Sequence, residues 1–232
     1  MISREEQLRS NLTNLQDAIR QKLANLNRLD KVTLIAVTKT WPASDIEILK
    51  KLGISDIGES KDQEASAKQE LVGSLGLTQH FIGQIQRNKI NSILKYSDVL
   101  HSVDRAELVN SLAAAALKLN RATQVFLQVN LEDHLNERRG GTNPRQLFEL
   151  AQQVKAVPLL ELKGLMAVAP LDIEPRSAFA SFAEVALNFE NEFPEANCRS
   201  IGMSSDWEAA LEFGATHLRI GSLLLGNRGQ IR

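Results

Sequence analysis

Cysteine and long apolar runs are scarce in this chain of 232 residues, and each scarcity excludes a class of protein. The single cysteine, Cys198, cannot form an internal disulfide, and no paired cysteine and histidine spacing is typical of a metal cage. No stretch approaches the ~20 apolar residues of a membrane-spanning helix, and residues 3–27 are charged and amphipathic, unlike a signal peptide. We therefore expect a cytoplasmic protein without a metal site or a membrane span.

An excess of charge of either sign is also missing, since 27 basic and 28 acidic side chains give a formal net charge of −1. A nucleic acid or an acidic membrane surface is therefore not indicated as a partner. The run Arg138-Arg-Gly-Gly141 is typical of a flexible polar loop, and one copy of it does not indicate RNA binding.

Nucleotide-binding motifs are absent as well. A dinucleotide site needs G-x-G-x-x-G directly after a strand, and Gly53, Gly58, Gly73 and Gly76 do not have that spacing. No P-loop is present. The motifs thus give no support for nucleotide-dependent chemistry.

The apolar residues, 43% of the chain, are sufficient for one large core. Neither a composition shift nor a linker marks a boundary, and α/β barrels of this length are common as one unit. We expect a single domain over residues 1–232.

Short β-rich segments alternate with longer helical patterns after an amphipathic N-terminal helix. That helix has leucines and isoleucines spaced by three or four residues, and Ser3 with Glu6 forms a capping box before it. The expected strands are Val32–Thr40, Ser55–Gly58, His80–Gly83, Val99–Val103, Gln124–Asn130, Leu160–Ala169, Arg199–Gly202 and His217–Gly221.

Helix start signals follow several of these strands. They are Pro42, Asp104 with Glu107, Asn143 before Pro144, and Ser205 with Glu208. Regular strand–helix alternation implies a parallel sheet, and eight repeats are most simply closed into an α/β (β/α)8 TIM barrel. An open doubly wound sheet is the alternative.

Lys39 is the first candidate functional residue, because it stands at the end of the first expected strand. Active sites of such barrels gather at the C-terminal ends of the strands. Counting by twos places Lys39 on the same side as Ile35 and Val37, toward the barrel interior. Desolvation there should lower the pKa of the amine and favour a Schiff base with an aldehyde, from a sugar phosphate or from pyridoxal phosphate.

Both aldehydes carry a phosphate, and two late segments are suited to an anion. Ile201–Asp206 follows the seventh strand and Arg219–Ser222 ends the eighth, where barrels often bind phosphate. If Ser205 caps the next helix, Ser204 and neighbouring N–H groups are left for the anion. Gly202 and Gly221 would allow close approach of the backbone.

A set of short motifs occurs in order along nearly the whole chain: Ala36-Val-Thr-Lys-Thr40, Gly58-Glu59, His80-Phe-Ile-Gly-Gln-Ile-Gln86 with Asn88-Lys89, Gln128-Val-Asn130, Gly164-Leu-Met166, Gly202-Met-Ser204 with Asp206, and Arg219-Ile-Gly221 with Gly226. Together these motifs resemble the pyridoxal phosphate (PLP) homeostasis protein family, a single-barrel relative of the alanine racemase N-terminal domain.

The resemblance implies that Lys39 forms an internal aldimine with PLP and that Met203 is among the cofactor-binding residues. It further implies that Ser204, Gly221 and Ser222 hold the phosphate. Arg219 would face the pyridine nitrogen, where a cation keeps the nitrogen unprotonated and weakens the ring as an electron sink.

The chain departs from the family pattern at several positions. The usual Gly-Glu-Asn-Arg is Gly58-Glu-Ser-Lys61 here, so a contact by the asparagine amide is in doubt at Ser60. Leu225 replaces an aromatic residue, Gln79 replaces a tryptophan, and the loop after Asn130 is about one residue longer. We expect PLP to bind with an altered rim.

An enzyme of the racemase type needs a second acid or base, and no residue is well placed for that role. Tyr96 is expected at the far end of the barrel, and the histidines are interpreted as structural: His80, His101, His134 and His217. Asp206 fits a helix start, and Glu59 is expected to orient loops or to pair with Lys61.

Without a covering second β domain, the outer face of the cofactor would meet solvent. The leading hypothesis is a noncatalytic PLP carrier that buffers or delivers the cofactor, with PLP-dependent apoenzymes as candidate recipients. By the resemblance, such a carrier would influence the balance of amino acids and keto acids. A monomer is expected.

Two alternatives to the carrier hypothesis remain. One is an enzyme, either an amino acid racemase or a Schiff-base aldolase, and the other is an interaction module whose cofactor tunes partner binding.

Overall fold

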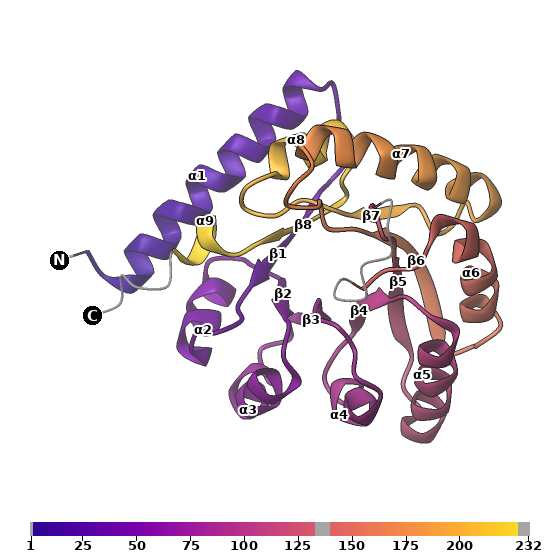
Figure 1. Ribbon diagram of the computed structural model, residues 1–232. Helices are drawn as coiled ribbons and strands as arrows, with labels where there is room; N and C mark the ends of the chain where they lie inside the picture. The colour runs from indigo at the N-terminus through magenta and orange to yellow at the C-terminus, as the bar shows by residue number, and fades with distance from the viewer. Residues whose placement is uncertain (1, 133–139, 227–232) are drawn as a thin grey trace.

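The computed structural model describes residues 2–132 and 140–226, and in them parallel strands close into a barrel in the order β1 to β8 (Figure 1). The strands are β1 Thr33–Val37, β2 Asp56–Glu59, β3 Thr78–Phe81, β4 Val99–Val103, β5 Thr123–Gln128, β6 Leu160–Met166, β7 Cys198–Ser200 and β8 His217–Ile220. The described part of the chain contains no second sheet. The predicted barrel is thus confirmed.

Pairing of β1 with both β2 and β8 closes the ring. Ala36 lies opposite Ile57 of β2 on one side and opposite Ile220 of β8 on the other. An open doubly wound sheet would leave two edge strands, so that alternative is wrong.

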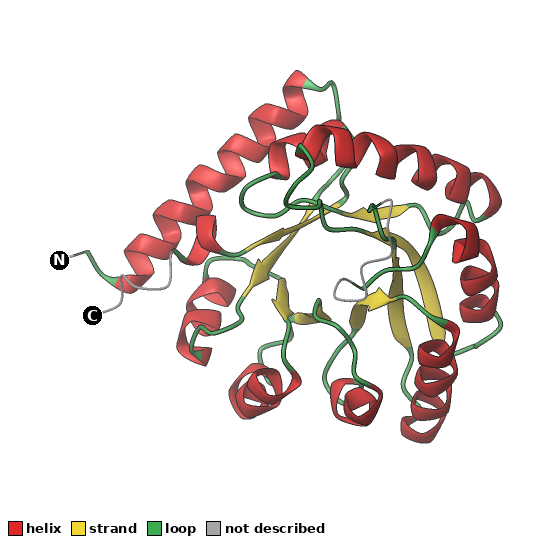
Figure 2. Ribbon diagram, viewed as in Figure 1, coloured by secondary structure: helices red, strands yellow, loops and turns green. Residues whose placement is uncertain are grey.

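Helices surround the strands on the outside (Figure 2). They are α1 Arg4–Asn25, α2 Ala43–Lys51, α3 Asp62–Val72, α4 Ile90–Ile93, α5 Ala106–Leu119, α6 Leu147–Lys155, α7 Pro175–Glu192, α8 Trp207–Glu212 and α9 Ser222–Leu225, with short 3-10 turns at Arg87–Lys89 and Pro144–Gln146. The extra N-terminal helix, α1, lies across α9 and α8 and is therefore part of the wall behind the last strand (Figure 1). None of the helices described here is both long and apolar enough to cross a membrane.

Three of the five predicted helix starts differ in detail from the structure. Pro42 was expected at the first helical position, but it is the N-cap of α2, which begins at Ala43. The Ser3–Glu6 capping box and the Asn143 cap before Pro144 are present. Asp104 and Ser205, however, do not cap their helices, because Arg105 and Asp206 occupy the N-cap positions. The Asp104 carboxylate instead accepts from the backbone N–H of Gly141 (3.2 Å).

The first expected strand is too long, and this matters for the site. β1 ends at Val37, so Lys39 lies in the turn that follows rather than in the strand. Thr40 has φ of 68°, a left-handed conformation that no regular strand contains. The sixth expected strand likewise ends at Met166 instead of Ala169.

Alternation along the strands separates two packing layers. Ala36, Ile57 and Ile220 belong to the apolar layer between barrel and helices. Inside the ring, Phe126 stacks on His101 with ring centroids 4.5 Å apart. The barrel interior therefore contains buried polar as well as apolar side chains.

Candidate functional site

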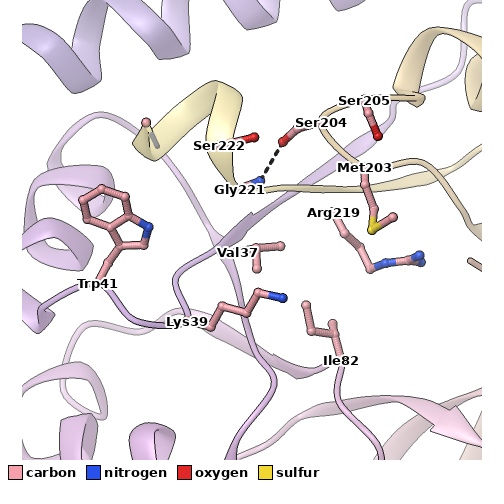
Figure 3. Close-up of a pocket in the computed structure, with 11 residues that line it drawn as sticks. Val37, Lys39, Trp41, Ile82, Met203, Ser204, Ser205, Arg219, Gly221 and Ser222 are labelled. Carbon is pink, nitrogen blue, oxygen red and sulfur yellow. Dashed lines mark hydrogen bonds between the residues drawn. The ribbon is translucent and has the colours of Figure 1, made fainter. Parts of the chain in front are cut away.

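A pocket of about 480 Å³ lies at the C-terminal end of the barrel, where the chain leaves β1, β7 and β8 (Figure 3). Its volume is in the range of small-molecule sites. All six residues predicted for the site line it: Lys39, Met203, Ser204, Arg219, Gly221 and Ser222. Strand ends more than 160 positions apart in the sequence therefore meet at one mouth, as the barrel topology requires.

Lys39 extends into this pocket from the turn after β1 (Figure 3). It is half-buried, and its Nζ makes no hydrogen bond or ion pair with any residue that the structure describes. A primary amine that faces a pocket without a protein partner is available to react with a carbonyl group of a ligand.

The turn that presents Lys39 is held from outside the barrel. Thr38 Oγ1 donates to Glu59 Oε1 (2.7 Å), and Lys68 Nζ donates both to the same carboxylate oxygen (2.7 Å) and to the carbonyl of Thr38 (2.9 Å). On the other side of Lys39, the backbone N–H of Thr40 donates to Glu64 Oε2 (2.8 Å). Side chains of β2 and α3 thus anchor the residues before and after the lysine.

The pairing expected for Glu59 was wrong, although its orienting role agrees with these contacts. Glu59 is buried and pairs with Lys68, whereas Lys61 pairs with Glu64 (3.2 Å). Lys68 is two helical turns into α3 and reaches back over the end of β2. Oε1 of Glu59 is therefore bound by Thr38 and Lys68, and Glu59 is not among the residues that line the pocket.

Backbone amides converge on the opposite wall. Ser204 Oγ accepts from the N–H of Gly221 (3.2 Å) and, at 3.4 Å, from the N–H of Leu223 (Figure 3). Ser222 is exposed beside them. These groups lie in the loop after β7 and at the start of a short extra helix after β8, the arrangement that binds phosphate in many barrels.

Gly202 and Gly221 were both expected to allow close approach of the backbone to an anion, but the structure shows a different constraint at each. Gly202 has φ of 92°, and a Cβ there would meet Ala210 Cβ at 2.6 Å and Leu218 Cδ2 at 2.8 Å. Its crowding therefore comes from protein packing and not from a ligand. Gly221 has negative φ, and a Cβ would meet only Val37 at ordinary contact distance (3.6 Å).

Arg219 is a buried cation on the inner side of the pocket. Its Nη1 donates to the carbonyl oxygen (2.5 Å) and to Oγ (2.7 Å) of Ser200, and Nη2 donates to the carbonyl of Ala167 (2.9 Å). Burial lowers the pKa of Arg219 to about 10, against a smaller raising effect of Asp206, so the side chain remains charged near neutral pH. Of its five N–H bonds, Nε–H and one on Nη2 have no acceptor among the described residues.

Acids and bases other than Lys39 and Arg219 do not line the described part of the pocket. Tyr96 is buried beside α3, where its hydroxyl donates to Asp62 (3.3 Å), and burial raises its pKa. Asp206 is also buried, and its Oδ1 accepts from the N–H of Met203 (2.5 Å). His134 and Arg138–Arg139 lie outside the described residues.

Sequence analysis missed several residues of the wall: Val37, Trp41, Ile82, Ser205 and Gly226. Trp41, only two positions after Lys39, was a signal that could have been used. Its ring is buried with the Arg4 guanidinium 4.7 Å from the ring centroid. Ser60, which departs from the family pattern, lines a different hollow beside Lys61 and is not among the residues that line the pocket of Lys39.

Comparison with known proteins defines the class first. A family model described as alanine racemase, N-terminal domain, matches residues 14–229. The pyridoxal phosphate homeostasis protein of Mycobacterium tuberculosis is 37% identical over 243 residues, with 94% of this chain and 93% of the relative covered. The corresponding protein of Escherichia coli is 34% identical, with coverage of 94% and 95%.

A solved structure gives the same result. PipY of Synechococcus elongatus, with PLP bound, superposes with a TM-score of 0.76 at 34% identity and covers 89% of this chain and 99% of its own. The chain belongs to the pyridoxal phosphate homeostasis protein family.

Proposed function

We propose that this protein binds PLP in the pocket at the C-terminal end of the barrel and takes part in PLP homeostasis, holding the cofactor for storage or delivery without turning over a substrate. The observation that carries the proposal is the free amine of Lys39 opposite the amide-lined wall at Gly221. An aldehyde with a phosphate tail can use both features at once.

The phosphate would be held by Ser204, Gly221 and Ser222. The oxygen of Ser204 already accepts from the amides of Gly221 and Leu223, so these donors point to a position that suits an oxygen atom. Phosphate oxygens are stronger acceptors than a hydroxyl, and backbone N–H groups that converge in a concavity commonly bind them.

Arg219 would face the ring nitrogen, with Met203 beside the ring. A guanidinium can only donate, so it requires a nitrogen with a free lone pair. PLP supplies electron-sink chemistry when its ring nitrogen is protonated, and an arginine partner disfavours that state. The N–H groups of Arg219 that lack an acceptor fit this contact.

Lys39 would join the cofactor aldehyde as an aldimine, with loss of water. The turn contacts of Thr38 and Thr40 hold the lysine toward the pocket. Ser205 and Ser222 are exposed at the mouth, so the cofactor would remain reachable from solvent. This accessibility supports transfer to another protein better than it supports controlled carbanion chemistry, which benefits from exclusion of water.

A noncatalytic role is also supported by the lining, which offers no carboxylate, imidazole, thiol or phenol among its described residues. A racemase needs a second proton carrier on the opposite face of the cofactor. Recipient apoenzymes, action as a monomer and a cytoplasmic location are parts of the same proposal; the single cysteine fits a reducing compartment.

Visible absorption and borohydride reduction test the capture of PLP. We expect purified protein incubated with PLP to gain the visible absorption of a PLP imine, and reduction to attach the label to the peptide containing Lys39. Lys39→Ala should abolish both signals. Lys61→Ala, which removes an exposed lysine near the same end of the barrel, should leave them intact. Label on any other lysine would refute the assignment.

Carrier and enzyme are separated by two further measurements on the PLP-loaded protein. A carrier should restore activity to a PLP-dependent apoenzyme in the presence of a scavenger that removes free PLP. Chiral chromatography of amino acids incubated with the protein should show no racemisation. Racemisation that disappears in Lys39→Ala would overturn the carrier proposal in favour of the enzyme.

A further inference from the structure

A chain of buried polar side chains crosses the barrel interior and ends at Arg219. His80 Nε2 lies 3.0 Å from Asp56 Oδ1, and His80 Nδ1 lies 2.9 Å from His101 Nε2. His101 Nδ1 is 3.0 Å from Ser200 Oγ, which accepts from Arg219 Nη1 (2.7 Å). The members come from β2, β3, β4, β7 and β8, so the chain connects five strands of the ring in Figure 1.

For a neutral His80, the acceptor at one end and the donor at the other determine the direction of every hydrogen bond. An ionised Asp56 can only accept, so His80 donates from Nε2 and, as neutral imidazole, accepts at Nδ1. His101 must then donate from Nε2, which leaves its Nδ1 as an acceptor. Ser200 therefore donates its hydroxyl hydrogen to His101 and keeps lone pairs for Arg219.

The charge states of Asp56 and His101 agree with these hydrogen-bond directions. Burial opposes ionisation of Asp56, but hydrogen bonds from His80 and Ser55 lower its pKa overall. Burial, together with the charge of Arg219, lowers the pKa of His101 well below its ordinary value, so His101 is neutral. A neutral His101 can accept from Ser200, as the geometry requires.

The chain has a consequence for the guanidinium plane. Ser200 contributes both its carbonyl and its hydroxyl to Nη1, and Ala167 contributes a carbonyl to Nη2, so the plane is held at both nitrogens. If Ser200 instead pointed its hydrogen at Arg219, the contact would be repulsive. The direction of the hydrogen bonds that starts at Asp56 thus determines whether Ser200 Oγ can accept from Arg219.

We propose that Asp56, His80, His101 and Ser200 are positioning residues for Arg219, and that they set how strongly the pocket prefers a ligand ring that has a nitrogen acceptor. The inference rests on the proposed PLP site. A purely structural role would explain the burial of these groups, but it would predict no effect on the choice between ligands that differ only at the ring nitrogen.

The experiment compares the Kd of PLP with that of its 1-deaza analogue, in which C–H replaces the ring nitrogen. A hydrogen bond from a charged donor corresponds to about a ten- to hundredfold change in Kd, so wild type should prefer PLP by about tenfold or more. Ser200→Ala and His101→Phe should each lower this preference by about three- to tenfold, with the Kd of the deaza analogue unchanged.

A double-mutant cycle identifies Arg219 as the residue through which Ser200 acts. In an Arg219→Ala background, Ser200→Ala should cause no further loss of preference. Asp56, at the partly exposed start of β2, offers substitutions outside the core: Asp56→Ala should lower the preference, whereas Asp56→Asn, which retains Oδ1 as an acceptor, should preserve it. Thr123→Val removes a buried hydroxyl that has no partner in the described structure and should have no effect.

The outcomes separate the two proposals. Wild-type protein that binds neither ligand would refute the PLP site and this inference with it. Wild-type protein that binds both ligands equally, or variants that keep the full preference while binding PLP, would overturn the positioning role and leave PLP capture in place.

Discussion

Individual residues around the pocket are constrained by different neighbours, even where they are of the same type. Gly202 is held at positive φ between Ala210 and Leu218, whereas Gly221 has room for a side chain. Among the histidines, His101 and His217 both lie in apolar or cationic surroundings that disfavour protonation. Two predictions follow from these local environments.

Gly202→Ala should lower the free energy of unfolding by about 2–4 kcal/mol, because strained φ and the clash with the Cβ of Ala210 both oppose it. Gly53→Ala is the matched control, since Gly53 has φ of 96° but nothing within 4 Å of an added Cβ. It should cost about 1 kcal/mol. Urea unfolding measures both, and equal losses would show that packing at Gly202 is unimportant.

His217 should make stability depend on pH. Burial, with the cation-favouring effect of Asp56 only partly opposing it, lowers its pKa to about 4. Between that value and the unfolded pKa of about 6.5, the unfolded state binds more protons, so stability falls as pH falls, by up to about 3 kcal/mol.

Unfolding at pH 8 and at pH 5 checks this sign, because carboxylates remain largely ionised over that interval. His217→Gln should lose less stability between the two pH values than wild type. A parallel loss in both proteins would assign the pH dependence to other groups, of which buried His101 is the first candidate.

Among the secondary structure elements, α3 is the one that controls the presentation of Lys39. It contributes Glu64 and Lys68 to the turn after β1, and β2 contributes Glu59. The site lysine is therefore supported by an element that provides none of the lining of its pocket. A substitution that perturbs α3 should therefore alter the position of Lys39 through the turn after β1.

Lys68→Met should destabilise the protein by about 3 kcal/mol, because it leaves the Glu59 carboxylate buried and unpaired. The double variant Glu59→Gln/Lys68→Met should recover most of that loss, since no charge is then stranded. Borohydride labelling of Lys39 should be slower in the single variant. Recovery of stability without recovery of labelling would indicate that the contact of Lys68 with the Thr38 carbonyl is the one that orients the lysine.

At the scale of the whole molecule, α1 connects the two ends of the barrel sequence. Arg4 pairs with Asp45 of α2 (2.6 Å), donates to the carbonyl of Leu225 in α9 (3.0 Å) and covers the ring of Trp41. Asn11 donates to the carbonyl of Leu224 (2.9 Å). The N-terminal helix thus fastens the short helix that starts at Ser222.

Arg4→Ala should reduce stability by about 1–2 kcal/mol, because Asp45 is buried and loses its partner. It should also speed amide exchange in α9 and weaken PLP binding several-fold. Arg9→Ala is the control on the same helix, as its pair with Glu5 is exposed and should contribute under about 0.5 kcal/mol. Unchanged exchange in α9 would mean that α1 does not fasten the phosphate wall.

The sequence by itself determined the barrel and the location of the site. Alternation of strands with helices, period-two patterns and capping residues act over short separations, so they can be read along the chain. Because strand ends of a barrel share one face, Lys39, Ser204 and Arg219 could be placed together before any coordinates. The ends of the strands were predicted less accurately, because β1 stops after Val37 where the chain turns toward the left-handed backbone at Thr40.

Only the tertiary structure decided the partners of buried polar groups. Ser200 and His101 are 99 positions apart, and Arg4 and Leu225 are 221 positions apart. Glu59 pairs with Lys68 rather than with Lys61, which is nearer in the sequence, because α3 brings Lys68 back over the end of β2. Such pairings depend on the register and curvature of the closed ring, which couple distant segments and leave no local pattern in the sequence.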